Sequence, residues 1–229
     1  MRIWDINPGY LNDQSLLGEH VELHGLFSVI INNKTGYSQH PETKRWFKLL
    51  GALNIRHDLI VSEMYLRGFK HNSPIKVIDK NILWPNKYID EPLNQFNILT
   101  EKYKNKNQGR IPLPDSSQFL WSQHKYSVMA RDLNIYKKIG NYVSNMNSNQ
   151  SFSDLSKELV ELLRIKPSLG GIRNSLQHMW GYFKKEKNIL DINSLDLGSL
   201  LSHIQEYAYK NENKYILNST ALSELRIWI

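Results

Sequence analysis

The residues best placed to do chemistry stand at the start of the sequence, where MRIWDINPGY leads directly into apolar and aromatic side chains. Chain ends are usually frayed, so this composition predicts a terminus that is docked on the protein. A free α-amine has a pKa of about 7.7–8.0, against about 10.4 for a lysine side chain, so part of it is a neutral nucleophile near pH 7. Docking therefore has two interpretations: it stabilises the fold, or it positions the α-amine of Met1 for a reaction.

A carboxylate could serve such an amine. Glu19 and Glu22 are one helical turn apart in the stretch GEHVE. The carboxylate of Glu22 could transfer protons during a reaction. The pattern by itself is more typical of the solvated face of an amphipathic helix.

Other chemistries lack their motifs. The sequence has no cysteine, which excludes disulfides, thiolate metal sites and a cysteine nucleophile within it. It has no glycine-rich phosphate loop, no Gly-x-Ser-x-Gly and no His-Glu-x-x-His. The eight histidines are scattered along the chain without convincing ligand spacing, so we predict no metal and no cofactor.

The net charge of +7 over 229 residues favours a polyanionic partner such as nucleic acid, although a solvated basic surface accounts for it equally well. No stretch approaches the roughly 20 apolar residues that cross a bilayer, and the first ten residues lack the layout of a signal peptide. We therefore expect a soluble, cytoplasmic protein with no membrane partner.

Apolar side chains at helical spacing predict a mostly α fold. The expected helices cover 11–32, 42–67 with a break near Gly51–Asn54, 92–104, 117–131, 133–146, 153–164, 170–187 and 195–210. Gly68 is well placed just after the second helix, and KYILN (214–218) is the one strand candidate. The polar stretch 104–118, which contains glycine and two prolines, predicts a boundary between two helical domains.

Four stretches of the first half together resemble the pyrimidine-dimer DNA glycosylases, which are small helical UV-repair enzymes known from a bacteriophage and from bacteria. They are MRIWDINPGYL (1–11), DQSLLGEHVEL (13–23), KTGYSQHPE (34–42) and EMYLRGF (63–69). The resemblance implies a glycosylase-like domain over 1–112. It also implies that the amine of the first residue attacks the sugar C1′ of a damaged nucleotide through a Schiff base, with Met1 as nucleophile and Glu22 as proton-transfer partner. The bulky Arg2 disfavours removal of Met1.

The resemblance suggests DNA contacts as well. Arg2 could hold a phosphate beside the lesion, and Tyr37 and His40 lie in a turn that could reach DNA, although a histidine before proline is more often a capping residue. Lys44 and Arg45 are further candidates. Three positions of the first helix depart from the phage enzyme's DNA-binding side chains, namely Ser15, Val21 and Gly25. The DNA contacts must therefore be rebuilt from other basic residues, or the substrate has changed.

Aromatic residues near the N-terminus could also stack on bases. Trp4, Tyr10 and Trp46 are the candidates. Such residues are more often part of the core, which is the interpretation we favour for Trp4 and Trp46.

The second half, 117–229, resembles a different family, the YbgA-like domain of unknown function. The resemblance rests on HKYSVMARD (124–132), Gly140 and NSLQHMWGYFKK (174–185). That domain occurs beside photolyases and nucleobase-desulfurising proteins, which points to damaged or modified nucleobases, and we predict DNA contacts at Arg173, His178 and Lys184. A polar and aromatic set could line a pocket or form a buried hydrogen-bond network, and we favour the network: His124, Asn174, Gln177, His178 and Tyr182.

These patterns predict a metal-independent DNA glycosylase and abasic-site lyase that acts, as a monomer, on double-stranded DNA with UV-type or other base damage. Two alternatives stay open. One is a non-catalytic nucleic-acid-binding repair accessory, and the other is an enzyme that acts on free modified nucleosides.

Overall fold

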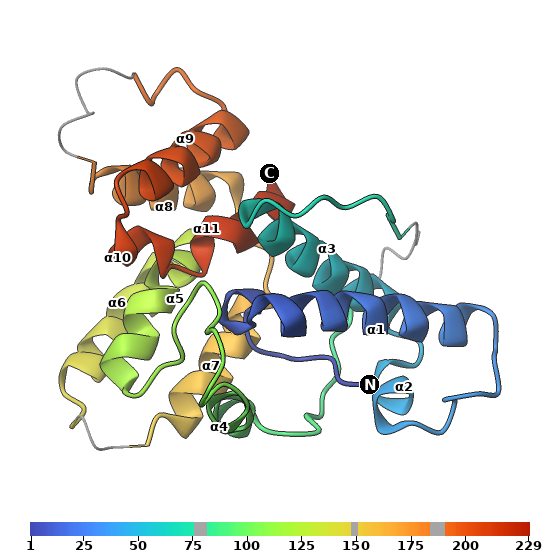
Figure 1. Cartoon of the computed structure of the whole chain (residues 1–229). Coiled ribbons are helices and arrows are strands. Elements are labelled where there is room, and N and C mark those ends of the chain that lie inside the picture. Colours follow the sequence, from blue (N-terminus) through green and yellow to red (C-terminus); the bar gives the residue numbers. More distant parts are fainter. Residues whose placement is uncertain (76–81, 148–150, 184–190) are drawn as a thin grey trace. The chain divides into compact units, whose positions relative to one another are not determined.

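The computed structural model (Figure 1) describes residues 1–75, 82–147, 151–183 and 191–229. These residues form helices and no strand, which confirms the mostly α fold. The chain divides into two compact units, Met1–Gly109 and Arg110–Ile229. No helix among the described residues has the length and apolar character needed to span a membrane.

The first unit is built on two long helices, α1 and α3, which pack against each other (Figure 1). Its helices are η1 (Pro8–Tyr10), α1 (Asp13–Ile31), α2 (Pro41–Trp46), α3 (Leu50–Leu66) and α4 (Pro92–Lys102). Leu16, Leu23 and Leu26 of α1 and the inward apolar side chains of α3 are buried, and the Tyr10 and Phe96 rings meet edge to face at 4.9 Å. Burial of these side chains supplies the main stabilisation of the unit.

The break between α2 and α3 comes earlier than the sequence predicts. It lies at Phe47–Leu49, where Lys48 has a φ of +65°, whereas Gly51 is inside α3 and buried. The left-handed backbone at Lys48 ends α2, and the apolar run that follows continues as one helix. The end of α3 agrees with prediction, since Gly68 adopts a φ of +82° directly after it, a conformation that favours glycine.

The second unit surrounds α5, which packs against α6, α7, α8 and α11. Its helices are α5 (Ser117–Arg131), α6 (Leu133–Ser144), α7 (Ser153–Leu163), α8 (Leu169–Trp180), α9 (Leu197–Lys210), α10 (Lys214–Leu217), α11 (Ala221–Glu224) and η2 (Leu225–Trp228). Gly171 permits the closest approach of α8 to α5, because a Cβ there would stand 2.0 Å from the Ala130 carbonyl oxygen.

Two sequence predictions for this unit need correction. KYILN is not a strand: Lys214–Leu217 form α10, since the Asn213 side chain accepts a hydrogen bond from the Ile216 N–H and so caps a helical turn. The helix expected over 170–187 ends at Trp180, and residues 184–187 lie outside the described part of the chain.

Candidate active site

The first residues form an extended segment with no helix or strand of its own, and side chains from three helices bind its backbone. A buried N–H group without a partner is costly, so such a segment needs acceptors. The N–H groups of Arg2, Ile3, Trp4 and Asp5 donate to Glu22 (2.6 Å), Glu42 (3.0 Å), Glu19 (3.2 Å) and Gln95 (2.9 Å), respectively. The terminus is therefore docked, and its position is set residue by residue.

This docking brings the α-amine beside a carboxylate. The Met1 nitrogen lies 3.8 Å from Oε1 of Glu22, while Oε2 of the same carboxylate accepts the Arg2 N–H at 2.6 Å. The N-terminus is next to α1 and α2 in Figure 1. The Glu22 side chain is 38% exposed, so the carboxylate is oriented by the backbone and still open to solvent.

A buried ion pair between Arg56 and Glu19 also holds the N-terminal segment in place. Nε and Nη2 of Arg56 donate to the two carboxylate oxygens of Glu19 at 2.7 and 2.8 Å, and Nη1 donates to the Ile6 carbonyl at 2.8 Å. Burial raises the pKa of Glu19, and the facing Arg56 guanidinium opposes that shift. The two glutamates of GEHVE thus differ: Glu19 is a buried structural anchor, and Glu22 is the one accessible beside the amine.

Arg45 belongs to this supporting network, which corrects its assignment as a DNA contact. Its guanidinium pairs with Asp5 and Glu42, both at 2.8 Å, and donates to the Ile3 carbonyl at 2.9 Å. The side chain is only 5% exposed. Because its donors are committed to buried acceptors, Arg45 is not available to a phosphate.

A pocket of about 500 Å³ opens beside Glu22. It is lined by Arg2, Trp4, Gln14, Ser15, Gly18, Glu19, Glu22, Ile98, Lys102 and Lys106. Arg2 lies over the Trp4 ring at 4.9 Å and pairs with Asp90 at 2.6 Å, and Lys102 donates to the Ser15 hydroxyl at 3.0 Å. Arg2, Lys102 and Lys106 therefore border the pocket beside Glu22, while Glu19 is neutralised by Arg56, an arrangement suited to an anionic ligand.

Lys102 and Lys106 are absent from the residues predicted from sequence. They lie in the lysine-rich stretch KYKNK (102–106), at the end of α4 and just after it, where the sequence predicts a helix end and a domain boundary. The signal in the sequence that could have indicated them is the recurrence of lysines beside a predicted helix end.

The loop candidates lie apart from this pocket. Tyr37 is 71% exposed with a φ of +61°, and neither it nor His40 or Lys44 lines the pocket beside Glu22. Nδ1 of His40 accepts the Glu42 N–H at 3.1 Å, so His40 caps α2. Lys44 is exposed and borders a second pocket of about 340 Å³ with Val29 and Phe47.

The aromatic residues near the terminus are core residues. Trp4 is 5% exposed, and Tyr10 and Trp46 are fully buried. This confirms the interpretation favoured for Trp4 and Trp46 and removes Tyr10 as a stacking side chain.

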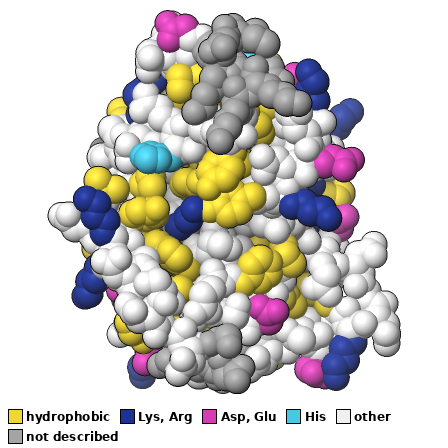
Figure 2. All heavy atoms as spheres, turned by 90° about the vertical axis from the view of Figure 1, so that its left-hand side faces the viewer, with side chains coloured by type: hydrophobic (Ala, Val, Ile, Leu, Met, Phe, Trp, Pro, Cys, Tyr) yellow, Lys and Arg dark blue, Asp and Glu magenta, His cyan; other side chains and the backbone are white. Residues whose placement is uncertain are grey.

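The candidates of the second unit are dispersed. Arg173 donates to the Leu195 carbonyl at 2.8 Å, His178 is exposed on α8, and Lys184 lies outside the described residues. On the face drawn in Figure 2, the described Lys and Arg side chains are separated by apolar and uncharged ones and form no continuous basic patch. DNA contacts by this unit stay a prediction.

The buried network predicted in this unit is wrong. Of its five members only His124 is buried, and it bonds the Leu120 carbonyl of its own helix at 2.9 Å. His178 and Tyr182 are exposed, and the Tyr182 ring stacks on Tyr215 at 4.6 Å. Helical spacing in the sequence could not show that α8 ends before Tyr182.

The interpretation of the histidines as scattered is also wrong for four of the eight. His20, His24, His57 and His71 each bring one ring nitrogen to within 4.8 Å of the others. No local spacing predicts this cluster, because His57 on α3 and His71 after it are far in sequence from the pair on α1.

In the comparison with known proteins, the two halves of the chain match two different family models. Residues 1–77 match the family model described as pyrimidine dimer DNA glycosylase, which agrees with the resemblance of the first half. Residues 125–189 match a family described as a protein of unknown function, DUF1722, which agrees with the resemblance of the second half. No curated protein and no solved structure matched the chain.

Proposed function

We propose that this protein is a DNA glycosylase and abasic-site lyase in which the α-amine of Met1 is the nucleophile and Glu22 the proton-transfer group. The observation that carries the proposal is the Met1 nitrogen 3.8 Å from Glu22, whose side chain lines a pocket bordered by cations. The match of residues 1–77 to the glycosylase family supports the same chemistry.

The proposed reaction uses the neutral amine. Its lone pair forms a bond to C1′ of the damaged nucleotide while the base leaves with a proton. Loss of the remaining N–H proton and opening of the sugar ring give an imine, with O4′ taking up a proton. Removal of a C2′ proton then expels the 3′ phosphate and nicks the strand. Glu22 can accept and return these protons because its carboxylate is adjacent and solvent-accessible.

The cations of the pocket suit the DNA backbone. Arg2, Lys102 and Lys106 come from two separate parts of the first unit and converge beside Glu22. Side chains of this kind bind phosphates and fix the position of the duplex without reading its sequence. We propose that these three replace the basic first-helix residues that are missing here, and that Tyr37, Lys44 and His178 are peripheral contacts.

Borohydride trapping tests the proposal, because the reductant converts the imine to a stable amine linkage. The full chain, begun at Met1, is incubated with abasic or dimer-containing duplex, reduced, and analysed for a covalent adduct. We expect an adduct whose peptide map places the linkage on the Met1 nitrogen. Glu22→Gln should lower the strand-nicking rate by about 100-fold or more, and Glu101→Gln, an exposed glutamate on α4, is the matched control.

Two further experiments distinguish the proposal from its alternatives. A tag that extends the N-terminus should abolish trapping, and a C-terminal tag should not. Salt-sensitive binding with no adduct on any damaged duplex would instead favour the accessory protein. Turnover of modified nucleosides without DNA would favour the nucleoside enzyme.

A further inference from the structure

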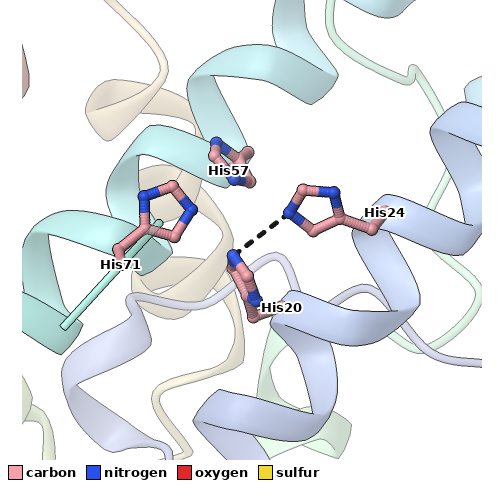
Figure 3. Close-up of side chains that lie close together, drawn as sticks. All are labelled: His20, His24, His57 and His71. Carbon is pink, nitrogen blue, oxygen red and sulfur yellow. Dashed lines mark hydrogen bonds between the residues drawn. The ribbon is translucent and has the colours of Figure 1, made fainter. Parts of the chain in front are cut away.

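Four histidines from three segments of the first unit point their rings at a common centre (Figure 3). His20 and His24 are one turn apart on α1, His57 is on α3, and His71 follows the turn at Gly68. One ring nitrogen of each lies within 4.8 Å of the others. The Nε2 atoms of His20 and His24 are only 3.2 Å apart.

Core packing does not account for the arrangement. The Nε2 atoms of His57 and His71 are buried without a hydrogen-bond partner among the described residues. A buried polar atom left in this way costs stability, and such atoms are uncommon in folded proteins. A bound cation would satisfy these converging nitrogens, because it accepts their unused lone pairs.

The partners outside the cluster orient the rings for this role. Nδ1 of His57 lies 3.3 Å from Oδ1 of Asp58, and the other Asp58 oxygen accepts from the Asn54 amide at 3.1 Å. A carboxylate that holds the far nitrogen of an imidazole keeps the near nitrogen unprotonated, which is the usual support of a metal-binding histidine. His71 likewise has a backbone hydrogen bond with Ser73.

We propose that His20, His24, His57 and His71 bind one divalent transition-metal ion, with Zn²⁺ as the best fit. A set made only of imidazoles suits zinc and its neighbours, whereas calcium and magnesium require oxygen ligands. Tetrahedral zinc with Zn–N bonds of 2.0–2.1 Å separates its nitrogens by about 3.3 Å. The His20–His24 pair already has nearly this spacing, and binding would draw the other two nitrogens inward.

The site is structural rather than part of the proposed reaction. His20 and Glu22 are two residues apart on α1, which places them about 200° apart around the helix. Four protein ligands also leave no open position on a tetrahedral ion. The ion would join α1 to α3 and to the segment after Gly68, and would so hold the helix that carries Glu22.

Metal analysis of the untagged full chain tests the inference. We expect one zinc per chain by mass spectrometry, or one equivalent bound on titration of the chelator-stripped protein. Cobalt loading should give the intense visible bands of a tetrahedral site, and zinc should raise the Tm by several degrees. The cobalt spectrum and the Tm shift use the wild-type chain, so they do not depend on a variant that folds.

Variants then locate the site. His24→Ala and His57→Ala should lower zinc affinity at least 10-fold, and Asp58→Asn by about 10-fold through its effect on His57. His203→Ala removes a histidine outside the cluster and should leave affinity unchanged. Absence of stoichiometric zinc and cobalt binding, or zinc binding that the His24 and His57 variants retain in full, would overturn the inference. Neither result affects trapping at Met1, so the two proposals fail separately.

Discussion

The two units bury charged groups for different purposes. Each contains a buried arginine–glutamate pair, Arg56–Glu19 in the first unit and Arg131–Glu224 in the second. Arg131 also donates to the Ser127, Leu163 and Ile165 carbonyls, so its pair joins the ends of helices. The first unit's pair instead holds an extended segment whose N–H groups donate to side chains of the neighbouring helices.

The difference indicates where chemistry can occur. A helix satisfies its own backbone, so a helical unit needs polar side chains mainly at helix ends. An extended chain end in a buried position needs an acceptor for nearly every N–H. The first unit supplies these acceptors from α1, α2 and α4, and the result is an amine fixed beside an accessible carboxylate. The proposed reaction is therefore assigned to the first unit.

The largest effect on stability is expected when the buried Arg56–Glu19 pair of the first unit is broken. Arg56→Ala leaves Glu19 buried without its partner and should lower the free energy of unfolding by about 3–5 kcal/mol. Urea unfolding measures the loss. Hydrogen exchange resolved by residue should show faster exchange at 2–6, since the acceptor of the Trp4 N–H is no longer held in place.

Arg131→Ala is the matched variant in the second unit. It should cost a similar free energy and increase exchange at the ends of α5 and α7 while leaving residues 2–6 protected. If Arg56→Ala left residues 2–6 protected as well, the role assigned to the Arg56–Glu19 pair would be wrong.

A second effect concerns pH in the second unit. His124 is buried and its burial lowers its pKa to about 4, against about 6.5 in an unfolded chain. Between these values the unfolded state binds a proton that the folded state does not, so the free energy of unfolding falls as the pH drops from 6.5 to 4. The full loss is roughly 3 kcal/mol.

Stability measured by urea unfolding at several pH values checks this prediction. His124→Gln should flatten the slope between pH 6.5 and 4, whereas His203→Gln should not. An NMR titration of His124 with a midpoint near 6.5 in the folded protein would contradict the assigned burial.

The smallest expected effect tests the packing of α8 on α5. Gly171→Ala places a methyl group 2.0 Å from the Ala130 carbonyl oxygen and should cost about 1–3 kcal/mol of unfolding free energy. Gly170→Ala, its neighbour, meets no atom within 4 Å and should be neutral or stabilising by up to about 1 kcal/mol. Equal thermal unfolding midpoints for the two variants would show that α8 can move away from α5 at little cost.

Several motifs are explained by short-range structure. In EMYLRGF, Arg67 pairs with Glu63 one turn earlier at 2.8 Å, and Gly68 ends the helix. In HKYSVMARD, Asp132 caps α6 by accepting from Asn134 and Ile135. Caps, turns and helical spacing act within a few residues, so the helices could be predicted before their packing was known.

The sequence by itself determined the helical class, most of the helices, the family resemblance of each half and the candidate pair of Met1 and Glu22. Tertiary structure alone decided which of two neighbouring glutamates is buried, that Arg45 supports the terminus, that Lys102 and Lys106 border the pocket, and that four histidines meet. The physical reason is sequence separation. Helix formation depends on neighbours a few positions away, whereas burial and convergence depend on how α1, α3 and α4 pack, and no local pattern specifies that packing.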